Sequence, residues 1–276
     1  MDFRILSWNL FHGRDHPPEP ELRTWRSRIL GRTERGESHA QVNVDLYSHF
    51  AGLLAGAQWD IALLQEMPPR WAERLAVDCD ADPHLVLTSR NIPRLGALQA
   101  CVADRNPDLI ASWEGGSNLT LVRSRAGGVI AERRSHRLAL RPERRVMAFT
   151  RLAAGLCLAN LHASADRAAA ERELPDAART AVAWAGGLPL VLGGDFNLRP
   201  ASSRGTFEDL ARDHDLAAPT GPHVIDHLLG RGLQVVDPPR QWPAELREVP
   251  DPTADWGSAL PIRLSDHAPV EAVFRI

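Results

Sequence analysis

Six short apolar runs in this chain each carry polar side chains at or near one end, and this pattern constrains the fold more than any other feature. These polar residues are Asn9, Glu66, His162, Asp195, Asn197, Asp226, Asp266 and His267. A β-strand holds the side chain at its end with little freedom, so several such ends can converge at one mouth of a packed fold. The sequence therefore predicts a shared polar site at one end of packed strands.

The apolar runs come in series, with few helical segments between them. Clusters of Gly, Pro and Arg separate them, and several contain β-branched or aromatic residues, which is typical of antiparallel strands. We therefore expect two packed sheets with outer helices rather than a parallel doubly wound sheet. The predicted strands cover residues 3–8, 60–65, 86–88, 119–122, 128–136, 146–152, 157–162, 188–193, 224–229, 233–236 and 268–276, whereas residues 95–103 fit either helix or strand.

Helical periodicity is clearest in two segments. Apolar residues at helical spacing predict a helix over residues 42–57. An alanine-rich stretch predicts a second helix over residues 166–185, which Pro175 should split or kink because proline lacks the backbone N–H. Shorter helices are expected over residues 70–77 and near residues 22–30.

The chain is interpreted as a single domain over residues 1–276, since no repeat and no linker divide it. The stretch at residues 12–40 is rich in Pro, Arg, Glu and His and has weak periodicity, so we expect it to be a surface insertion. Residues 90–115 and 199–222 are interpreted as further loops. Substrate specificity should depend on these three segments, because loops carry most binding residues.

The charge balance narrows the classes of partner. The formal net charge is −3, and all 32 cationic residues are arginine. This balance argues against a tight clamp around duplex nucleic acid, although guanidinium groups still offer bidentate phosphate contacts. Five arginines are candidates for such contacts, and each also fits a solvated surface residue: Arg123, Arg125, Arg144, Arg145 and Arg199.

Signals for secretion, membrane insertion and disulfide bonding are weak in this sequence. No apolar run approaches the roughly 18 residues needed to cross a bilayer, and the N-terminal residues do not resemble a signal peptide. The three cysteines are odd in number, and Cys157 fits a buried core thiol. We therefore expect a soluble, cytoplasmic monomer that has no membrane or protein partner.

The segment Asp195-Phe196-Asn197 follows an apolar run that ends in two glycines. In an extended chain, residues two apart project to the same side, so a carboxylate and an amide would share one reacting centre while Phe196 packs inward. An Asp-x-Asn after a strand is also typical of turn chemistry. Each of the other polar residues has a similar structural interpretation, such as a cap or a satisfied core histidine. Their combination in one order favours a functional site.

Six segments, in this order, carry a resemblance to a known family: Trp8-Asn9, Leu64-Gln65-Glu66, Asn160-Leu161-His162, Gly193-Gly194-Asp195-Phe196-Asn197, Ile225-Asp226-His227 and Ser265-Asp266-His267. The chain thereby resembles the endonuclease/exonuclease/phosphatase superfamily from about residue 3 to residue 274. Its members include deoxyribonucleases, abasic-site endonucleases, sphingomyelinases and inositol polyphosphate phosphatases. The resemblance implies an α/β (α+β) fold, a four-layer sandwich of two packed mixed, mainly antiparallel sheets with helices on the outer faces.

The same resemblance implies divalent-metal phosphoester hydrolysis, with Mg²⁺ as the expected cofactor and Mn²⁺ as an alternative. Glu66 corresponds to the principal metal ligand, with Asp266 and Asn9 nearby. This donor set agrees with the chemistry of Mg²⁺, which prefers oxygen ligands and keeps several waters, so that one or two carboxylates suffice.

The catalytic roles are likewise implied by the resemblance. Asp195 and Asn197 correspond to the pair that orients the attacking water and the scissile phosphate, and Asp226 to the carboxylate that orients the phosphate-facing His267. Either Asp195 or the Asp226–His267 pair could be the general base. Our hypothesis gives that role to Asp195 and transition-state stabilisation to a protonated His267. Phosphate binding is implied for His162, Asn197 and Asn118.

Two departures narrow the branch of the family. Abasic-site endonucleases and exonuclease III carry an aspartate at the position of Phe11, and they tend to have a tyrosine at the position of His162. Both differences favour the deoxyribonuclease-like and phosphatase branches. We therefore expect a phosphodiester hydrolase that cleaves nucleic acid, DNA or RNA. The alternative is a phosphatase or phosphodiesterase for small or lipid-derived phosphate esters. A non-catalytic binding module is disfavoured, because every expected catalytic position is filled.

Overall fold

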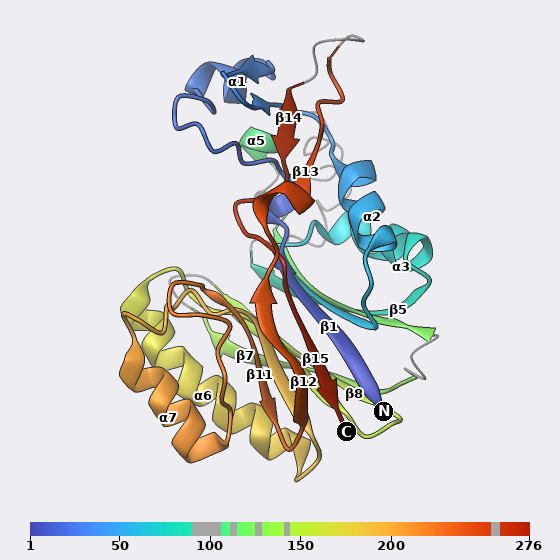
Figure 1. Cartoon of the computed structure of the whole chain (residues 1–276), viewed down its shortest axis with the longest axis vertical. Coiled ribbons are helices and arrows are strands. Elements are labelled where there is room, and N and C mark those ends of the chain that lie inside the picture. The colour runs from blue at the N-terminus through green and yellow to red at the C-terminus, as the bar shows by residue number, and fades with distance from the viewer. Residues whose placement is uncertain (90–105, 111–114, 125–128, 141–143, 255–259) are drawn as a thin grey trace.

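The computed structural model describes residues 1–89, 106–110, 115–124, 129–140, 144–254 and 260–276, and its framework is a pair of β-sheets packed face to face (Figure 1). The six-stranded sheet contains β1 (Asp2–Asn9), β4 (Ile61–Gln65), β5 (Ala81–Ser89), β6 (Gly116–Arg123), β12 (Gln234–Gln241) and β15 (Val270–Arg275). The five-stranded sheet contains β7 (Ile130–Ala139), β8 (Arg145–Leu152), β9 (Cys157–His162), β10 (Leu190–Asp195) and β11 (Asp226–Arg231).

The two sheets have a similar mixed topology. Their strand orders are β12-β15-β1-β4-β6-β5 and β11-β10-β9-β8-β7. In each sheet one central pair is parallel, β1 with β4 and β9 with β10. The other neighbouring strands are antiparallel. The predicted pair of mixed, mainly antiparallel sheets is therefore confirmed.

Three apolar clusters define the layers of the sandwich. Since side chains alternate between the faces of a strand, each sheet has an inner and an outer set. The inner sets meet between the sheets, for example Phe3 and Ile5 from β1 with Leu158 from β9. The outer sets pack against α2 (Tyr47–Gly56) and α3 (Ala72–Asp78) on one side, and α6 (Arg167–Ala185) and α7 (Arg204–His214) on the other. The predicted four-layer arrangement is confirmed (Figure 1).

Two of the predicted helices differ in detail. The helix predicted over residues 42–57 begins only at Tyr47, because Val42 and Asn43 are bonded elsewhere: the N–H of Val42 donates to Asp15, and the Asn43 amide donates to the carbonyl of Ser27. The helix α6 runs through Pro175 without a break. Its buried small and apolar side chains on both sides of the proline pack against the five-stranded sheet, which stabilises the helix despite the missing hydrogen bond.

The predicted loop over residues 199–222 was wrong for its central part, where α7 forms. This short helix buries Phe207 and Leu210 in the cluster that covers the five-stranded sheet. Phe207, Leu210 and Ala211 stand at helical spacing in an otherwise polar segment, a signal that the sequence interpretation did not use. The apolar side of this amphipathic helix therefore packs on the sheet and its polar side faces away from the core.

The insertion at residues 12–40 forms α1 (Trp25–Leu30), close to the predicted helix, and β2 (Glu34–Arg35), which pairs with β3 (Ala40–Gln41). It is not wholly a surface segment, since Asp15 and Ser27 are buried. Asp15 also forms an isolated bridge with Leu264, next to the hairpin of β13 (Glu248–Pro250) and β14 (Pro261–Arg263). The insertion and this hairpin lie at one end of the sandwich, towards which β1 runs (Figure 1).

A few elements complete the described chain. They are the four-residue helix α5 (Pro107–Ile110) and the 3₁₀ turns at Phe11–Gly13, Pro69–Trp71 and Ala244–Arg247. The predicted helix over residues 70–77 corresponds to the second of these turns followed by α3. The segment 95–103, predicted as helix or strand, lies outside the described residues. Within the described ranges, no helix has the length and apolarity to cross a bilayer.

Candidate active site

In the six-stranded sheet, the ends of three adjacent strands bring predicted site residues together. Asn9 ends β1 opposite the last residue of the parallel β4, so that Glu66 follows at the same sheet edge. Asp266 and His267 lie in the turn that leads into β15, the other neighbour of β1. The hydroxyl of Ser265 donates to the Asn9 carbonyl at 2.6 Å and thereby anchors this turn.

The five-stranded sheet supplies the facing half of the site. His162 ends β9 and pairs in register with Asp195, the last residue of the parallel β10. Asp226 opens β11 directly opposite Asp195. Because these strand ends stand at the same end of the sandwich as Asn9 and Glu66, residues far apart in the chain surround one centre.

Asp195 lies at that centre and is almost fully buried. The amide of Asn9 donates to its Oδ2 at 3.0 Å. The Nε2 atoms of His162 and His267 lie 3.5 and 3.7 Å from the same oxygen. Burial raises the pKa of Asp195 to about 7, since a buried site disfavours the charged form; His267 opposes this rise and Asp226 adds to it. The carboxyl can therefore gain or lose a proton near neutral pH.

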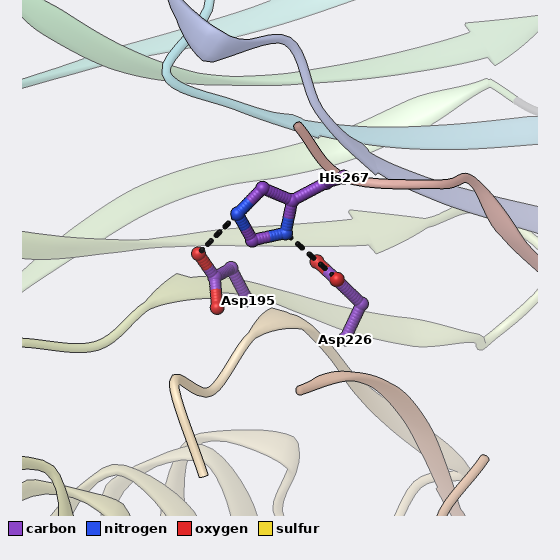
Figure 2. Close-up of side chains that lie close together, drawn as sticks. All are labelled: Asp195, Asp226 and His267. Carbon is purple, nitrogen blue, oxygen red and sulfur yellow. Dashed lines mark hydrogen bonds and ion pairs between the residues drawn. The ribbon is translucent and has the colours of Figure 1, made fainter. Parts of the chain in front are cut away.

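His267 and the buried Asp226 form a pair beside Asp195 (Figure 2). Nδ1 of His267 lies 2.8 Å from Oδ2 of Asp226, so this nitrogen carries a proton and donates it. Burial by itself would lower the pKa of His267, but the carboxylates of Asp226 and Asp195 outweigh it and raise the pKa well above its usual value. Nε2, the other ring nitrogen, faces Asp195 and Asp266.

Asn197 reaches the site through a turn rather than an extended strand. β10 ends at Asp195, Asn197 has a positive φ of 52°, and its backbone N–H donates to Oδ1 of Asp195 at 2.9 Å. Its amide donates to the carbonyl of Ala163 and approaches Asp195 Oδ2 at 3.4 Å. The extended geometry that we expected for these residues is wrong, because the Asx-type turn brings them together instead. Phe196 is buried in the core, as expected.

Glu66 also has a positive φ, 44°. Its carboxylate lies between two imidazoles, with His12 Nε2 at 3.3 Å from Oε2 and His162 Nε2 at 3.7 Å from Oε1. Burial raises the pKa of Glu66, and the positive charges of His267, Arg14 and Arg145 partly offset that rise. The sequence interpretation missed His12 and Arg14. Both residues come shortly after the first strand, close to Asn9 in the sequence, and this position was the signal that could have identified them.

The three predicted metal ligands fit a hard divalent cation. Glu66 is a half-buried carboxylate, Asp266 is an exposed carboxylate, and Asn9 supplies an amide that also hydrogen-bonds to Glu66. Oxygen donors of this kind suit Mg²⁺ or Mn²⁺. Among the described residues, Asp195, Asp226 and His267 also place one donor atom each within 4.8 Å of one another. Nδ1 of His267 is occupied by its hydrogen bond to Asp226, so only Nε2 of this ring faces the space between these groups.

Asn118 does not line the site like the other predicted residues. It is fully buried in β6, where its amide donates to the carbonyl of Val146 at 3.0 Å and to that of Asn160 at 3.3 Å. Asn160 in turn accepts a hydrogen bond from Gln65 at 2.8 Å. These buried amides connect the two sheets directly beneath the site. The phosphate contact of Asn118 stays a prediction that these hydrogen bonds do not support.

The arginines proposed as phosphate contacts separate into two groups. Arg145 is buried in the site, with Nη1 3.2 Å from Nδ1 of His162. Burial and this guanidinium lower the pKa of His162 well below its usual value, so this histidine is neutral. Arg123 and Arg144 instead bind backbone carbonyls within the fold. Arg125 lies outside the described residues.

Arg199 lines an open pocket of about 400 Å³ that adjoins the His267 side of the site. The pocket also contains His223, Gln241, Trp242 and Arg247, besides Asp226, Asp266 and His267. A group attached to a phosphate at the centre would have room here, in contact with cationic, amide and aromatic side chains.

Comparisons with known proteins identify the family and the fold of this chain. A model described as the endonuclease/exonuclease/phosphatase family matches residues 6–267. Among curated proteins, no sequence matches the chain significantly. An endonuclease/exonuclease/phosphatase family protein from Bacteroides thetaiotaomicron shares the fold with a TM-score of 0.63 and 14% identity, over 99% of this chain and 95% of that one.

Two further solved structures share the fold at similarly low identity. The mannosyl-6-phosphatase Bt3783 of Bacteroides thetaiotaomicron has a TM-score of 0.61 and 14% identity, over 99% of this chain and 100% of that one. Truncated TDP2 of Caenorhabditis elegans has a TM-score of 0.52 and 15% identity, over 100% of this chain and 98% of that one. The family match covers nearly the whole sequence, and this chain therefore belongs to the endonuclease/exonuclease/phosphatase family.

Proposed function

We propose that this protein is a divalent-metal-dependent phosphodiester hydrolase that cleaves nucleic acid. The observation that carries the proposal is the cluster of Asn9, His162, Asp195 and the Asp226–His267 pair around one centre, beside Glu66. Membership of the endonuclease/exonuclease/phosphatase family supports a phosphoesterase of this kind. A monomer that acts in the cytoplasm remains our prediction for its state and location.

The proposed cation would be held by Glu66, Asp266 and Asn9. When bound, it would neutralise charge on a phosphoryl oxygen and on the leaving oxygen. The side chains of the site have the remaining roles. The Asn9 side-chain amide and the Asn197 backbone N–H orient the Asp195 carboxylate and hold it in place. Neutral His162 and the cationic Arg145 behind it favour an anionic group at the centre.

Asp195 is our candidate for the general base. Its pKa of about 7 leaves the carboxylate available to accept a proton from an attacking water near neutral pH. His267, held in orientation by Asp226, keeps a proton on Nε2 for the phosphoryl oxygen as negative charge develops. The two roles are compatible. When Asp195 accepts a proton it loses its negative charge, and the Asp226 carboxylate still stabilises the imidazolium of His267.

A second candidate is a phosphatase or phosphodiesterase for small or lipid-derived phosphate esters. The similar fold of a mannosyl-6-phosphatase favours it, as does the pocket of about 400 Å³ beside His267, which is large enough for one sugar-sized group. A non-catalytic binding module remains disfavoured, since Glu66, Asp195 and His267 are all present and surround one centre.

A hydrolysis panel with and without EDTA tests the proposal. It contains single- and double-stranded DNA, RNA, abasic DNA, inositol phosphates, mannose 6-phosphate and a bis-aryl phosphate, with Glu66→Ala as the inactive control. We expect metal-dependent cleavage of DNA or RNA and none of the sugar or inositol phosphates. The reverse pattern would favour the second candidate, and no hydrolysis of any substrate would contradict both.

The roles within the site have their own test. Asp195→Asn should lower kcat by about 10²–10⁴-fold, because it removes the base while it keeps the shape of the side chain. The limb of the pH–rate profile that reports this group, near pH 7, should disappear at the same time. If Asp195→Asn retains a near-normal rate and His267→Ala instead abolishes the low-pH limb that reports the base, the Asp226–His267 pair is the base.

A further inference from the structure

His12 stands next to the carboxylate that we propose as the principal metal ligand. Its Nε2 lies 3.3 Å from Oε2 of Glu66, and the two side chains are 14% and 23% exposed. His162 lies on the far side of the same carboxylate, with its Nε2 3.7 Å from Oε1 of Glu66. His12 therefore faces the proposed cation site and belongs to the same group of side chains.

The backbone around His12 determines this position closely. Phe11, His12 and Gly13 have positive φ values of 49°, 54° and 77°, a conformation that residues with a Cβ adopt at a cost. The His12 N–H donates to the Glu66 carbonyl at 3.0 Å. On the other side, a Cβ on Gly13 would come within 2.2 Å of the ring of Trp71. The turn is thus tied to Glu66 and packed against the core, so it has little freedom to move the imidazole elsewhere.

The separation of the two side chains suits a shared cation. A cation with bonds of about 2.1 Å to two donors holds them about 3.0 Å apart in octahedral and about 3.4 Å apart in tetrahedral geometry. The observed 3.3 Å between His12 Nε2 and Glu66 Oε2 falls in this range. His162 is less suited to the same role, because the guanidinium of Arg145 lies against its ring nitrogens at 3.2 and 3.4 Å.

Resting on the proposed metal-dependent function, we propose that His12 is a further ligand of the cation held by Glu66, so that the site binds Mn²⁺ in preference to Mg²⁺. A site made of carboxylate and amide oxygens suits Mg²⁺ well. An imidazole nitrogen shifts the preference towards transition-metal ions, for which nitrogen is a better ligand. The metal specificity of this chain is then determined in part by a residue outside Glu66, Asp266 and Asn9.

Isothermal titration of the chelator-treated full chain with MnCl₂ and with MgCl₂ tests this assignment. The variant is His12→Asn, because asparagine tolerates a positive φ, and the matched control is His214→Asn at the end of α7. The wild type and the control should bind Mn²⁺ more tightly than Mg²⁺. Since loss of even an outer partner of a metal ligand weakens binding by about 10–100-fold, His12→Asn should weaken Mn²⁺ binding by at least about tenfold and Mg²⁺ binding much less.

Electron spin echo modulation of bound Mn²⁺ gives a readout that a merely structural role of His12 would not change. The wild type should show ¹⁴N modulation from a coordinated imidazole, and both His12→Asn and His12→Gln should lose it. Loss of the signal in His162→Asn but not in the His12 variants would overturn the assignment, as would unchanged Mn²⁺ affinity in folded His12 variants. Absence of any divalent-cation binding by the wild type would instead contradict the proposed function itself.

Discussion

His227 makes the stability of this protein depend on pH in a way that the structure quantifies. The ring is fully buried beneath the site, next to Asp226. Its Nε2 donates to the carbonyl of Leu198 at 3.1 Å, while Nδ1 accepts the backbone N–H of Thr220 at 3.2 Å. Both nitrogens are therefore used in the neutral form. A proton added to Nδ1 would point at the N–H of Thr220, so the folded state resists protonation.

Burial lowers the pKa of His227 from 6.5 to about 4, against the opposing effects of the Leu198 carbonyl and Asp226. Because the pKa in the folded state lies below that in the unfolded state, the unfolded chain binds this proton first as the pH falls. The contribution to stability is complete above about pH 6.5 and is lost between about pH 6.5 and pH 4. At 1.36 kcal/mol per pH unit, the full loss is about 3 kcal/mol, of which about 2.5 kcal/mol is lost by pH 4.5.

Urea unfolding of the wild type and of His227→Gln between pH 7.5 and pH 4.5 measures this loss. Glutamine keeps a donor for Leu198 and does not titrate, so the variant should be less stable than the wild type at pH 7.5. The difference between the two proteins should shrink by about 2.5 kcal/mol at pH 4.5. The control His214→Gln should follow the wild type throughout. A difference between wild type and His227→Gln that stays constant over this range would refute the reasoning.

Two further substitutions test the framework of the fold. The guanidinium of Arg123 donates to five carbonyls at the end of α2, in the following loop and after α3. Arg123→Met leaves these carbonyls without their donor, so it should lower the free energy of unfolding by about 3 kcal/mol or more in chemical denaturation. The specific activity of Arg123→Met per folded molecule should not change, because Arg123 lies at the opposite end of the sheet from Glu66. A loss of activity without a loss of stability would contradict this placement. Gly194 has a φ of 134°, and a Cβ added to it would lie 1.9 Å from the Leu161 carbonyl, so Gly194→Ala should prevent stable folding. The control Gly205→Ala meets open space in α7 and should be neutral or slightly stabilising in thermal unfolding.

Much of the framework could be predicted because its signals are local. An apolar run such as that of β10 forms a strand almost wherever it is placed in a core, and two glycines mark the close approach of another backbone. The order of polar residues at the strand ends predicted which groups would meet. The structure confirms this meeting for Asn9, Glu66, His162 and Asp195 through distances of 3.0–3.7 Å.

Other features could not be predicted, because they depend on where distant backbone groups lie. α7 has apolar residues at helical spacing, but its place in the fold depends on the apolar surface that the five-stranded sheet offers to Phe207 and Leu210. The phosphate contact of Asn118 stays a prediction, and the two carbonyls that accept its hydrogen bonds belong to strands far away in sequence. Buried polar groups require partners, and the identity of those partners is a tertiary property.

The sequence by itself determined the sandwich of two sheets and the kinds of groups that meet at its end, because hydrophobic patterning and strand-end chemistry are properties of short segments. Only the tertiary structure decided the environment of each charge. Arg123 and Arg145 look alike in the sequence, but one binds the carbonyls around α2 and the other lies against His162. The electrostatic energy of a charged side chain depends on the groups within a few ångströms of it, and the chain brings those groups together only when it is fully folded.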